Sequence, residues 1–76
     1  MEKGILKEVK RAVPHFLKMH PRNMWIDYDE GADVLYISFE KPQNASDSEL
    51  VDDIIIHTRG KKTVGLTIMH ASDYST

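Results

Sequence analysis

Apolar side chains recur at helical spacing over the first part of the chain, with basic residues mostly at the intervening positions. This pattern predicts an amphipathic helix within residues 1–22. Pro14 lies inside it, and an interior proline loses one backbone hydrogen bond and crowds the carbonyl of Lys10. We therefore expect a kink or a stop near Val13 and an end by Pro21. The apolar positions are Ile5, Leu6, Val9, Ala12, Val13, Phe16 and Leu17.

From residue 24 the apolar positions alternate, which predicts strands. A first strand ends near Tyr28, and a second spans residues 33–39. Asp29, Glu30 and Gly31 lie between them, where a hairpin turn needs residues that tolerate positive φ or bond to their own backbone. These acidic residues are therefore interpreted first as turn residues.

The second strand is apolar on both faces. Val34 and Tyr36 point one way, and Leu35, Ile37 and Phe39 point the other. The N-terminal helix can cover one face, but the rest of the chain is too short to build a second layer for the other face. Homodimerisation through the sheet or its edge is the expected solution.

The remaining chain predicts a polar loop followed by a second hairpin. Residues 41–50 are rich in Pro, Asn, Ser and acid, and we expect them to form an exposed loop. Strands are expected over residues 52–58 and 63–70. A connection with an odd number of residues would pair Ile56 with Leu66 and Ile54 with Ile68, so the hydrophobic pattern favours an odd connection.

These elements predict an α+β fold, with an N-terminal amphipathic helix and a four-stranded antiparallel β-meander. The expected organisation is a helical segment over residues 1–22 and a sheet domain over residues 23–76. A chain of 76 residues buries only about 60% of its unfolded surface, so an added partner chain is expected to stabilise it. Cysteine is absent, which excludes disulfides and any site built on cysteine.

The net charge of −2 conceals an uneven distribution. Residues 1–22 carry six Lys/Arg and two Glu, giving +4; residues 23–58 carry one Lys and nine Asp/Glu, giving −8; residues 59–76 give +2. A basic arm beside an acidic body can attract nucleic acid, or it can pack on the acidic surface of its own chain or of a second copy. Packing within the protein is the favoured interpretation.

Two motifs mark the start and the end of the sheet region. They are Tyr28, Asp29, Ala32, Asp33, Val34, Leu35, Tyr36 and Ile37, and then Val64, Gly65, Leu66, Ile68, Ala71 and Ser72. With these motifs the sheet region resembles an uncharacterised family, domain of unknown function 2283. The resemblance covers residues 26–73 and leaves the N-terminal helix outside. It implies a compact antiparallel meander that is dimeric, and some members of the family resemble companions of small toxin-type proteins.

Carboxylates supply one candidate for chemistry. They would converge if the first and third predicted strands were neighbours, and could then hold a divalent metal or share a proton. Solvated turns explain the same residues, and no serine has a His and Asp at a recognisable spacing. His57 and His70 lie too far apart along the predicted hairpin to share a metal. The carboxylates are Asp29, Glu30, Asp33, Asp52 and Asp53, of which Asp29, Asp33, Asp52 and Asp53 are the candidate metal ligands.

The basic helix supplies a second candidate, a nucleic-acid surface with salt-dependent phosphate contacts. No helix-turn-helix or RNA-binding signature accompanies it, so a solvated helix face is favoured. The residues concerned are Lys3, Lys7, Lys10, Arg11, Lys18 and Arg22.

The favoured interpretation is a small homodimeric protein-interaction module, antitoxin-like or regulatory, rather than an enzyme. The alternatives are a divalent-metal protein or hydrolase that uses the carboxylates, and a nucleic-acid binder. We expect no cofactor. The chain start lacks signal-peptide features and no apolar run could cross a membrane, so a cytoplasmic protein is expected. The expected interface residues are Trp25, Leu35, Tyr36, Ile37, Phe39 and Ile55.

Overall fold

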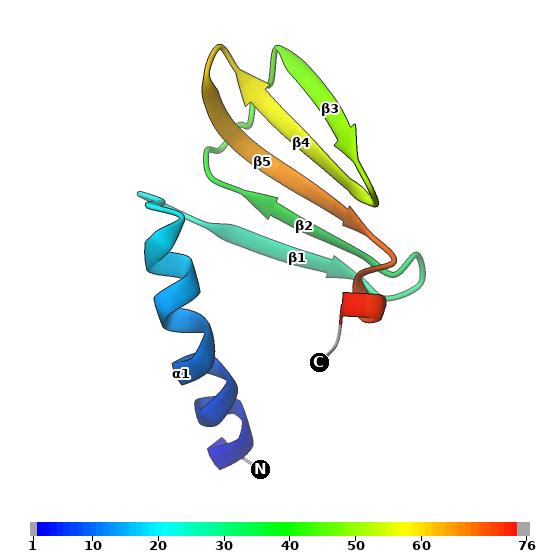
Figure 1. The fold of residues 1–76 in the computed structure, drawn as a ribbon. Helices are drawn as coiled ribbons and strands as arrows, with labels where there is room; N and C mark the ends of the chain where they lie inside the picture. Colours follow the sequence, from blue (N-terminus) through cyan, green and yellow to red (C-terminus); the bar gives the residue numbers. More distant parts are fainter. Residues whose placement is uncertain (1, 75–76) are drawn as a thin grey trace.

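The computed structural model describes residues 2–74 and consists of one helix and a five-stranded sheet (Figure 1). The helix α1, Glu2–Lys18, precedes strands β1, Trp25–Asp29, and β2, Val34–Ser38. Strands β3, Asp47–Val51, β4, Ile54–Arg59, and β5, Lys62–Met69, follow, and the short 3-10 helix η1, Ala71–Tyr74, comes last. All strand pairs are antiparallel. The predicted α+β class is confirmed.

Helix α1 runs through Pro14 without interruption and ends at Lys18. The expected stop near Val13 is therefore wrong, whereas the expected end before Pro21 is confirmed. The last turn closes with bonds from the Met19 amide to the Phe16 carbonyl and from the His20 amide to the Leu17 carbonyl, both 3.1 Å. His20 has φ 56°, the left-handed conformation that commonly ends helices, and proline follows it.

The sheet has the strand order β1-β2-β5-β4-β3, which is one strand more than the sequence predicted. The additional strand is β3, in a segment expected to be an exposed loop. Its residues pair with β4 from Asp47 opposite Thr58 to Val51 opposite Ile54. Asp52 and Asp53 form the connection, and Asp52 has φ 55°, a conformation that Asp adopts at low cost in tight hairpin turns. The polar composition of residues 41–50 concealed a strand that lies at the sheet edge.

The pairing of β4 with β5 follows the predicted register by a different route. Ile56 lies opposite Leu66 and Ile54 opposite Ile68, as expected, but the connection Gly60–Lys61 has an even number of residues. The register shifts between His57 and Thr58. This leaves Val64 as the extra residue of a β-bulge, which restores the parity that the hydrophobic pattern requires.

Helix α1 extends past β1 and away from the sheet (Figure 1). Within residues 2–74, the extensive contacts between elements all join neighbouring strands, and α1 makes no extensive contact with any strand. The expectation that the helix covers one sheet face is therefore wrong for the single chain. The linker after the helix, residues 19–24, turns at His20 and Pro21 and enters β1 with the helix directed outward.

The bulge brings the chain close around Gly65. An added Cβ there would lie 1.7 Å from Gln43 Nε2 and 3.0 Å from the Ile37 carbonyl oxygen. Gln43 also donates to Ser38 Oγ at 3.2 Å, so residues of the β2–β3 connection close over this part of β5. Val64 beside it is fully buried. A side chain at position 65 would therefore displace Gln43 and press on the Ile37 carbonyl.

We predict that Gly65→Ala lowers the free energy of unfolding by about 1–3 kcal/mol, because Gln43 and the Ile37 carbonyl must both shift. The measurement is a urea unfolding curve. Gly31→Ala is the matched control, since its Cβ would meet only Asp29 Oδ1 at 3.6 Å, and it should change stability by less than about 0.5 kcal/mol. Equal effects of the two substitutions would contradict the packing argument.

Candidate interaction surface

One face of the sheet is almost entirely apolar. Cross-strand partners share a face, so the registers assemble two rows, each running across all five strands. Glu49 is the only charged side chain in these rows. We call this surface the apolar face; its rows are Ile26, Ile37, Leu66, Ile56 and Glu49, and then Tyr28, Leu35, Ile68, Ile54 and Val51.

The opposite face is mixed in character. Its central rows combine aromatic, aliphatic and polar side chains, and Lys41 lies over the Trp25 ring at 6.0 Å from the centroid. We call this surface the mixed face; its rows are Trp25, Ser38, Gly65, His57 and Ser48, and then Asp27, Tyr36, Thr67, Ile55 and Leu50.

The register divides the predicted interface residues between the two faces. Leu35 and Ile37 lie on the apolar face, and Phe39 lines a pocket together with Leu66 of that face. The other three, Trp25, Tyr36 and Ile55, belong to the mixed face. The sequence analysis grouped Ile55 with Leu35, but Ile54 and Ile56 are the residues of β4 that share Leu35's face. The run of three isoleucines concealed this alternation.

The protomer leaves an unusual amount of apolar surface in water. Within the part of the chain whose burial is described, Ile37 and Val64 are the only buried hydrophobic side chains. The apolar stripe of α1 is open to solvent as well, with Ile5 59%, Leu6 55% and Leu17 67% exposed. A folded domain normally removes such residues from water. Both the sheet and the helix therefore lack the layer that their patterns predict.

The total accessible surface confirms this. The protomer exposes 6182 Å², whereas a compact monomer of 8.7 kDa exposes about 4,700 Å². Its radius of gyration is 13.4 Å, against about 11.4 Å for a compact chain of this length. The excess of about 1,500 Å² exceeds the roughly 800 Å² that each partner contributes to a standard interface.

Asp33, in the turn of the first hairpin, is the centre of a group of hydrogen bonds that we call the Asp33 network. Its carboxylate accepts bonds from the Tyr28 hydroxyl at 2.6 Å, from the Ser72 hydroxyl at 2.7 Å and from the Ser72 amide at 3.1 Å. The Ala71 amide donates to its carbonyl at 3.0 Å. Bonds from Tyr28 and Ser72 lower the pKa of Asp33, and the same bond to Asp33 raises the pKa of Tyr28.

The Asp33 network joins the first and the last of the residues on which the family resemblance rests, Tyr28 and Ser72. Asp29 Oδ1 accepts the Ala32 amide at 3.2 Å, and Asp33 adopts φ 57°, so these acids do shape the turn as predicted. They also bind the segment after β5 to the hairpin. Spacing alone could not show this second role, because Asp33 and Ser72 are 39 positions apart.

The carboxylates proposed as metal ligands do not converge. Among the described residues, no group of three or more His, Asp or Glu is placed to hold a metal ion. The predicted convergence required the first strand to adjoin the strand that is now β4, but β2 and β5 separate them. Asp29 and Asp33 lie at the β1–β2 turn, while Asp52 and Asp53 connect β3 to β4. His57 pairs with Gly65 as expected, well before His70 along β5.

A chain of polar side chains crosses the mixed face, and sequence reasoning missed it. Ser48 Oγ lies 3.0 Å from His57 Nδ1, and His57 Nε2 lies 2.9 Å from Thr67 Oγ1. A serine beside a histidine is a nucleophile–base geometry. However, the third group is a hydroxyl rather than a carboxylate, and neither described pocket is lined by any of the three. The arrangement ties β3, β4 and β5 together; recognising β3 as a strand would have revealed it.

Glu40 makes the strongest ion pairs of the described residues. It contacts Arg59 at 2.6 Å and Lys62 at 2.5 Å. The hydrogen bonds from Arg59 and then from Lys62 lower the pKa of Glu40 to about 2. Arg22, Lys41 and Lys62 line a neighbouring open pocket of 410 Å³ together with Glu40, so one carboxylate already neutralises part of its positive charge.

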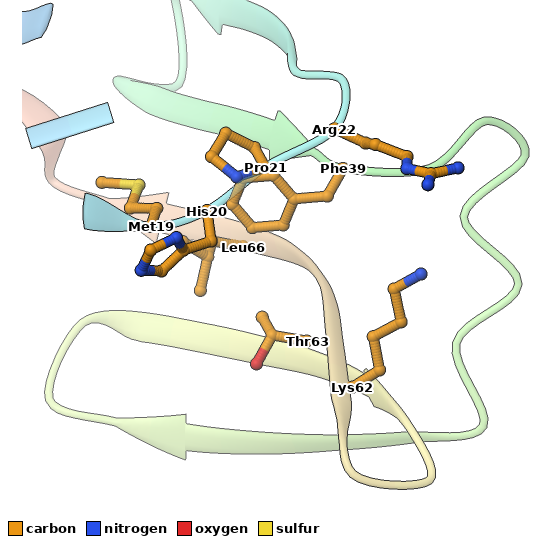
Figure 2. A pocket seen from close by; sticks show the side chains of 8 residues that line it. All are labelled: Met19, His20, Pro21, Arg22, Phe39, Lys62, Thr63 and Leu66. Carbon is orange, nitrogen blue, oxygen red and sulfur yellow. The ribbon is translucent and has the colours of Figure 1, made fainter. Parts of the chain in front are cut away.

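A larger pocket of 530 Å³ lies where the linker crosses the end of the apolar face (Figure 2). Met19 and Pro21 of the linker line it together with Phe39 and Leu66 of the sheet. Arg22 and Lys62 also border it. The linker is thus positioned over this corner of the sheet, although the helix that precedes it is not.

The basic residues of the helix are dispersed rather than gathered into a site. Lys7, Arg11 and Lys18 recur at helical spacing on the side opposite the apolar stripe, and Arg11 contacts Glu8 at 3.5 Å. Lys10 borders the apolar stripe, and Arg22 lies in the linker beside both pockets. The side chain of Lys3 lies outside the described residues. Across residues 2–74, no helix has the length and apolarity to span a membrane.

Comparison with known proteins identifies a family without assigning an activity. A family model described as protein of unknown function (DUF2283) matches residues 25–72. No curated protein and no solved structure matches the chain. The matched region begins with β1 and ends in η1, so it contains the whole sheet and the Asp33 network. Helix α1 and the linker lie outside it.

We predict that Glu40 contributes stability above about pH 4.5 that disappears as the pH falls toward 2, because its folded pKa of about 2 lies below the ordinary value of 4.5. The difference in melting temperature between the wild type and Glu40→Gln should therefore narrow over that window. Glu30→Gln, at the opposite end of the sheet, is the control and should not reproduce the narrowing. A difference that stays constant from pH 7 to 2 would contradict the prediction.

Proposed function

The chain belongs to the DUF2283 family, and from that premise we propose that it is a small homodimeric protein-interaction module. Its action is association: the apolar face of each protomer is covered in the complex, and no bond is made or broken. The open apolar face is the observation that carries this proposal. Two rows of side chains across five strands contain one charge, a composition typical of a domain core rather than of a water-facing surface.

The energetics of a lone protomer support the same proposal. With Ile37 and Val64 the only buried hydrophobic side chains of the described residues, the single sheet removes little apolar surface from water. Each Å² of apolar surface removed contributes about 25 cal/mol, and about 57% of a typical interface is apolar. Covering half of the 1,500 Å² excess would therefore contribute on the order of 10 kcal/mol before the costs of association. Folding and dimerisation should therefore occur together.

Charge supplies selectivity for the proposed assembly. The segment 23–58 carries −8 and the segment 1–22 carries +4. Electrostatic complementarity mainly sets the rate and specificity of association, while the apolar contact supplies its strength. A regulatory or antitoxin-like role would use the same acidic body to select a basic protein partner. The proposal is committed to the homodimer, because the apolar face has no cover beyond the corner that the linker crosses.

The enzyme and metal alternatives have less support. The carboxylates lie in separate turns, and the Ser48–His57 pair lies on an open strand surface outside both pockets. A catalytic site needs groups held around a common reacting atom. The described residues gather no such set.

We predict that Ile26→Asp raises the dissociation constant of the dimer by about 100-fold, since an unpaired charge would be buried in the interface. Ile26 is 48% exposed in the protomer and lies on edge strand β1, so the protomer itself tolerates the change. The measurement is analytical ultracentrifugation over a dilution series.

The matched control is Leu50→Asp. Leu50 is 63% exposed and also lies on an edge strand, β3, but it belongs to the mixed face. It should leave the dissociation constant within about threefold of the wild type. A wild-type protein that is monomeric at all concentrations, or equal weakening by both substitutions, would overturn the proposed homodimer through the apolar face.

A further inference from the structure

We propose that the cover of the apolar face is α1 of a second copy of this chain, so that two protomers exchange their helices reciprocally. This inference rests on the proposed homodimer and specifies which surfaces meet. The juxtaposition behind it is an uncovered apolar helix stripe and an uncovered apolar sheet face in one chain, with the helix directed past β1 (Figure 1).

The apolar stripe of the helix matches the sheet in kind. At 100° per residue, Ile5, Leu6, Val9, Val13 and Leu17 fall within an arc of about 120°. All five side chains are more than 40% exposed. An arc of this width is typical of a helix that packs on a sheet rather than of a solvated one. The stripe makes no extensive contact with any strand of its own chain.

The two surfaces also match in size. The helix has 17 residues and is about 25 Å long at 1.5 Å per residue. Five strands at about 4.8 Å spacing place the outer strands about 19 Å apart. One helix laid across the strands therefore reaches from one edge of the apolar face to the other. Each chain supplies one apolar sheet face and one apolar helix, so in the exchanged dimer every face is covered by one helix.

The linker explains why a second copy, rather than the same chain, provides the helix. Met19 and Pro21 line the pocket at the corner of the apolar face with Phe39 and Leu66 (Figure 2). His20, two positions after the end of the helix, has a left-handed conformation with φ 56°, and the proline after it fixes the next φ. This turn directs α1 outward past β1. Folding back onto the same sheet would require reversing it and removing the linker from the pocket.

Charge favours the same contact between copies. The basic segment 1–22 carries +4 and the acidic segment 23–58 carries −8. In an exchanged dimer each basic helix lies against the acidic body of the other protomer, with Lys10 bordering the buried stripe. Two bare apolar faces packed directly on each other would instead bring two acidic bodies together. Exchange therefore satisfies both the apolar pattern and the charge asymmetry.

The test uses cysteines introduced into the full-length chain, which has none of its own. Val9→Cys marks the helix stripe, and Leu35→Cys, Leu66→Cys and Ile68→Cys mark successive places on the apolar face. The helix variant is mixed with each sheet variant in turn, and the two chains are refolded together and oxidised mildly. Several sheet positions are used because a disulfide needs Cα atoms within about 7 Å. Covalent dimers are then measured by non-reducing electrophoresis and mass spectrometry.

Exchange predicts a covalent dimer in at least one helix–sheet mixture and none with Leu35→Cys, Leu66→Cys or Ile68→Cys alone. Covalent dimers from a sheet variant alone would show face-to-face packing, which overturns the exchange and leaves the proposed homodimer intact. A chain carrying both cysteines that closes an internal disulfide at monomer mass would show that the helix covers its own sheet. No covalent dimer in any mixture of a protein that sediments as a dimer would also overturn the exchange.

A second measurement separates the helix contact from the dimer itself. Val9→Asp should raise the dissociation constant at least 100-fold, as is expected of Ile26→Asp. Lys7→Gln, which makes the same one-unit change of charge on the opposite side of α1, should change it less than threefold. If Ile26→Asp dissociates the dimer and Val9→Asp does not, the proposed function stands and the helix exchange fails. If neither substitution has an effect, the homodimer through the apolar face fails as well.

Discussion

A single antiparallel sheet pairs the backbone groups of its inner strands by itself, but it cannot remove the side chains on its two faces from water. Each strand points alternate residues to two faces, and both faces stay wet unless another layer covers them. In this protein nearly all residues of one face are apolar, and the chain places no second layer on it. The missing layer explains the large exposed area, the two buried side chains of the described core and the helix that extends into solvent.

The Asp33 network has a structural role, unlike the apolar face. It gathers Tyr28, Asp33, Ala71 and Ser72, residues on which the family resemblance depends, into one network of hydrogen bonds. Each of these groups has a structural partner, and none is directed to a pocket. The motif therefore fixes the segment after β5 against the first hairpin at one end of the sheet. The function has to be sought in the surfaces that the network holds in place and in α1, which lies outside the matched region.

Local sequence patterns predicted most of the helices and strands. They failed where the structure depends on contacts between residues far apart in the sequence. Alternation located β1, β2, β4 and β5, and paired Ile56 with Leu66 before any geometry was known. It missed β3 because Asp47 and Ser48 look like loop residues when their partner strand is not considered. It could not separate Ile55 from Leu35, since three consecutive isoleucines give no alternation, and it could not foresee that the turn at His20 would direct the helix outward.

The edges of the sheet limit what kind of assembly the protein can form. The outer strand β1 carries Asp27 and Asp29, and the outer strand β3 carries Asp47 and Glu49. Strand edges with unpaired backbone groups are templates for endless sheet extension, and like charges on both edges oppose it. Growth sideways is therefore disfavoured while contact through the apolar face is favoured. The homodimer proposed above would therefore close on itself at a fixed size and stay dispersed, although the single chain exposes enough apolar surface to aggregate.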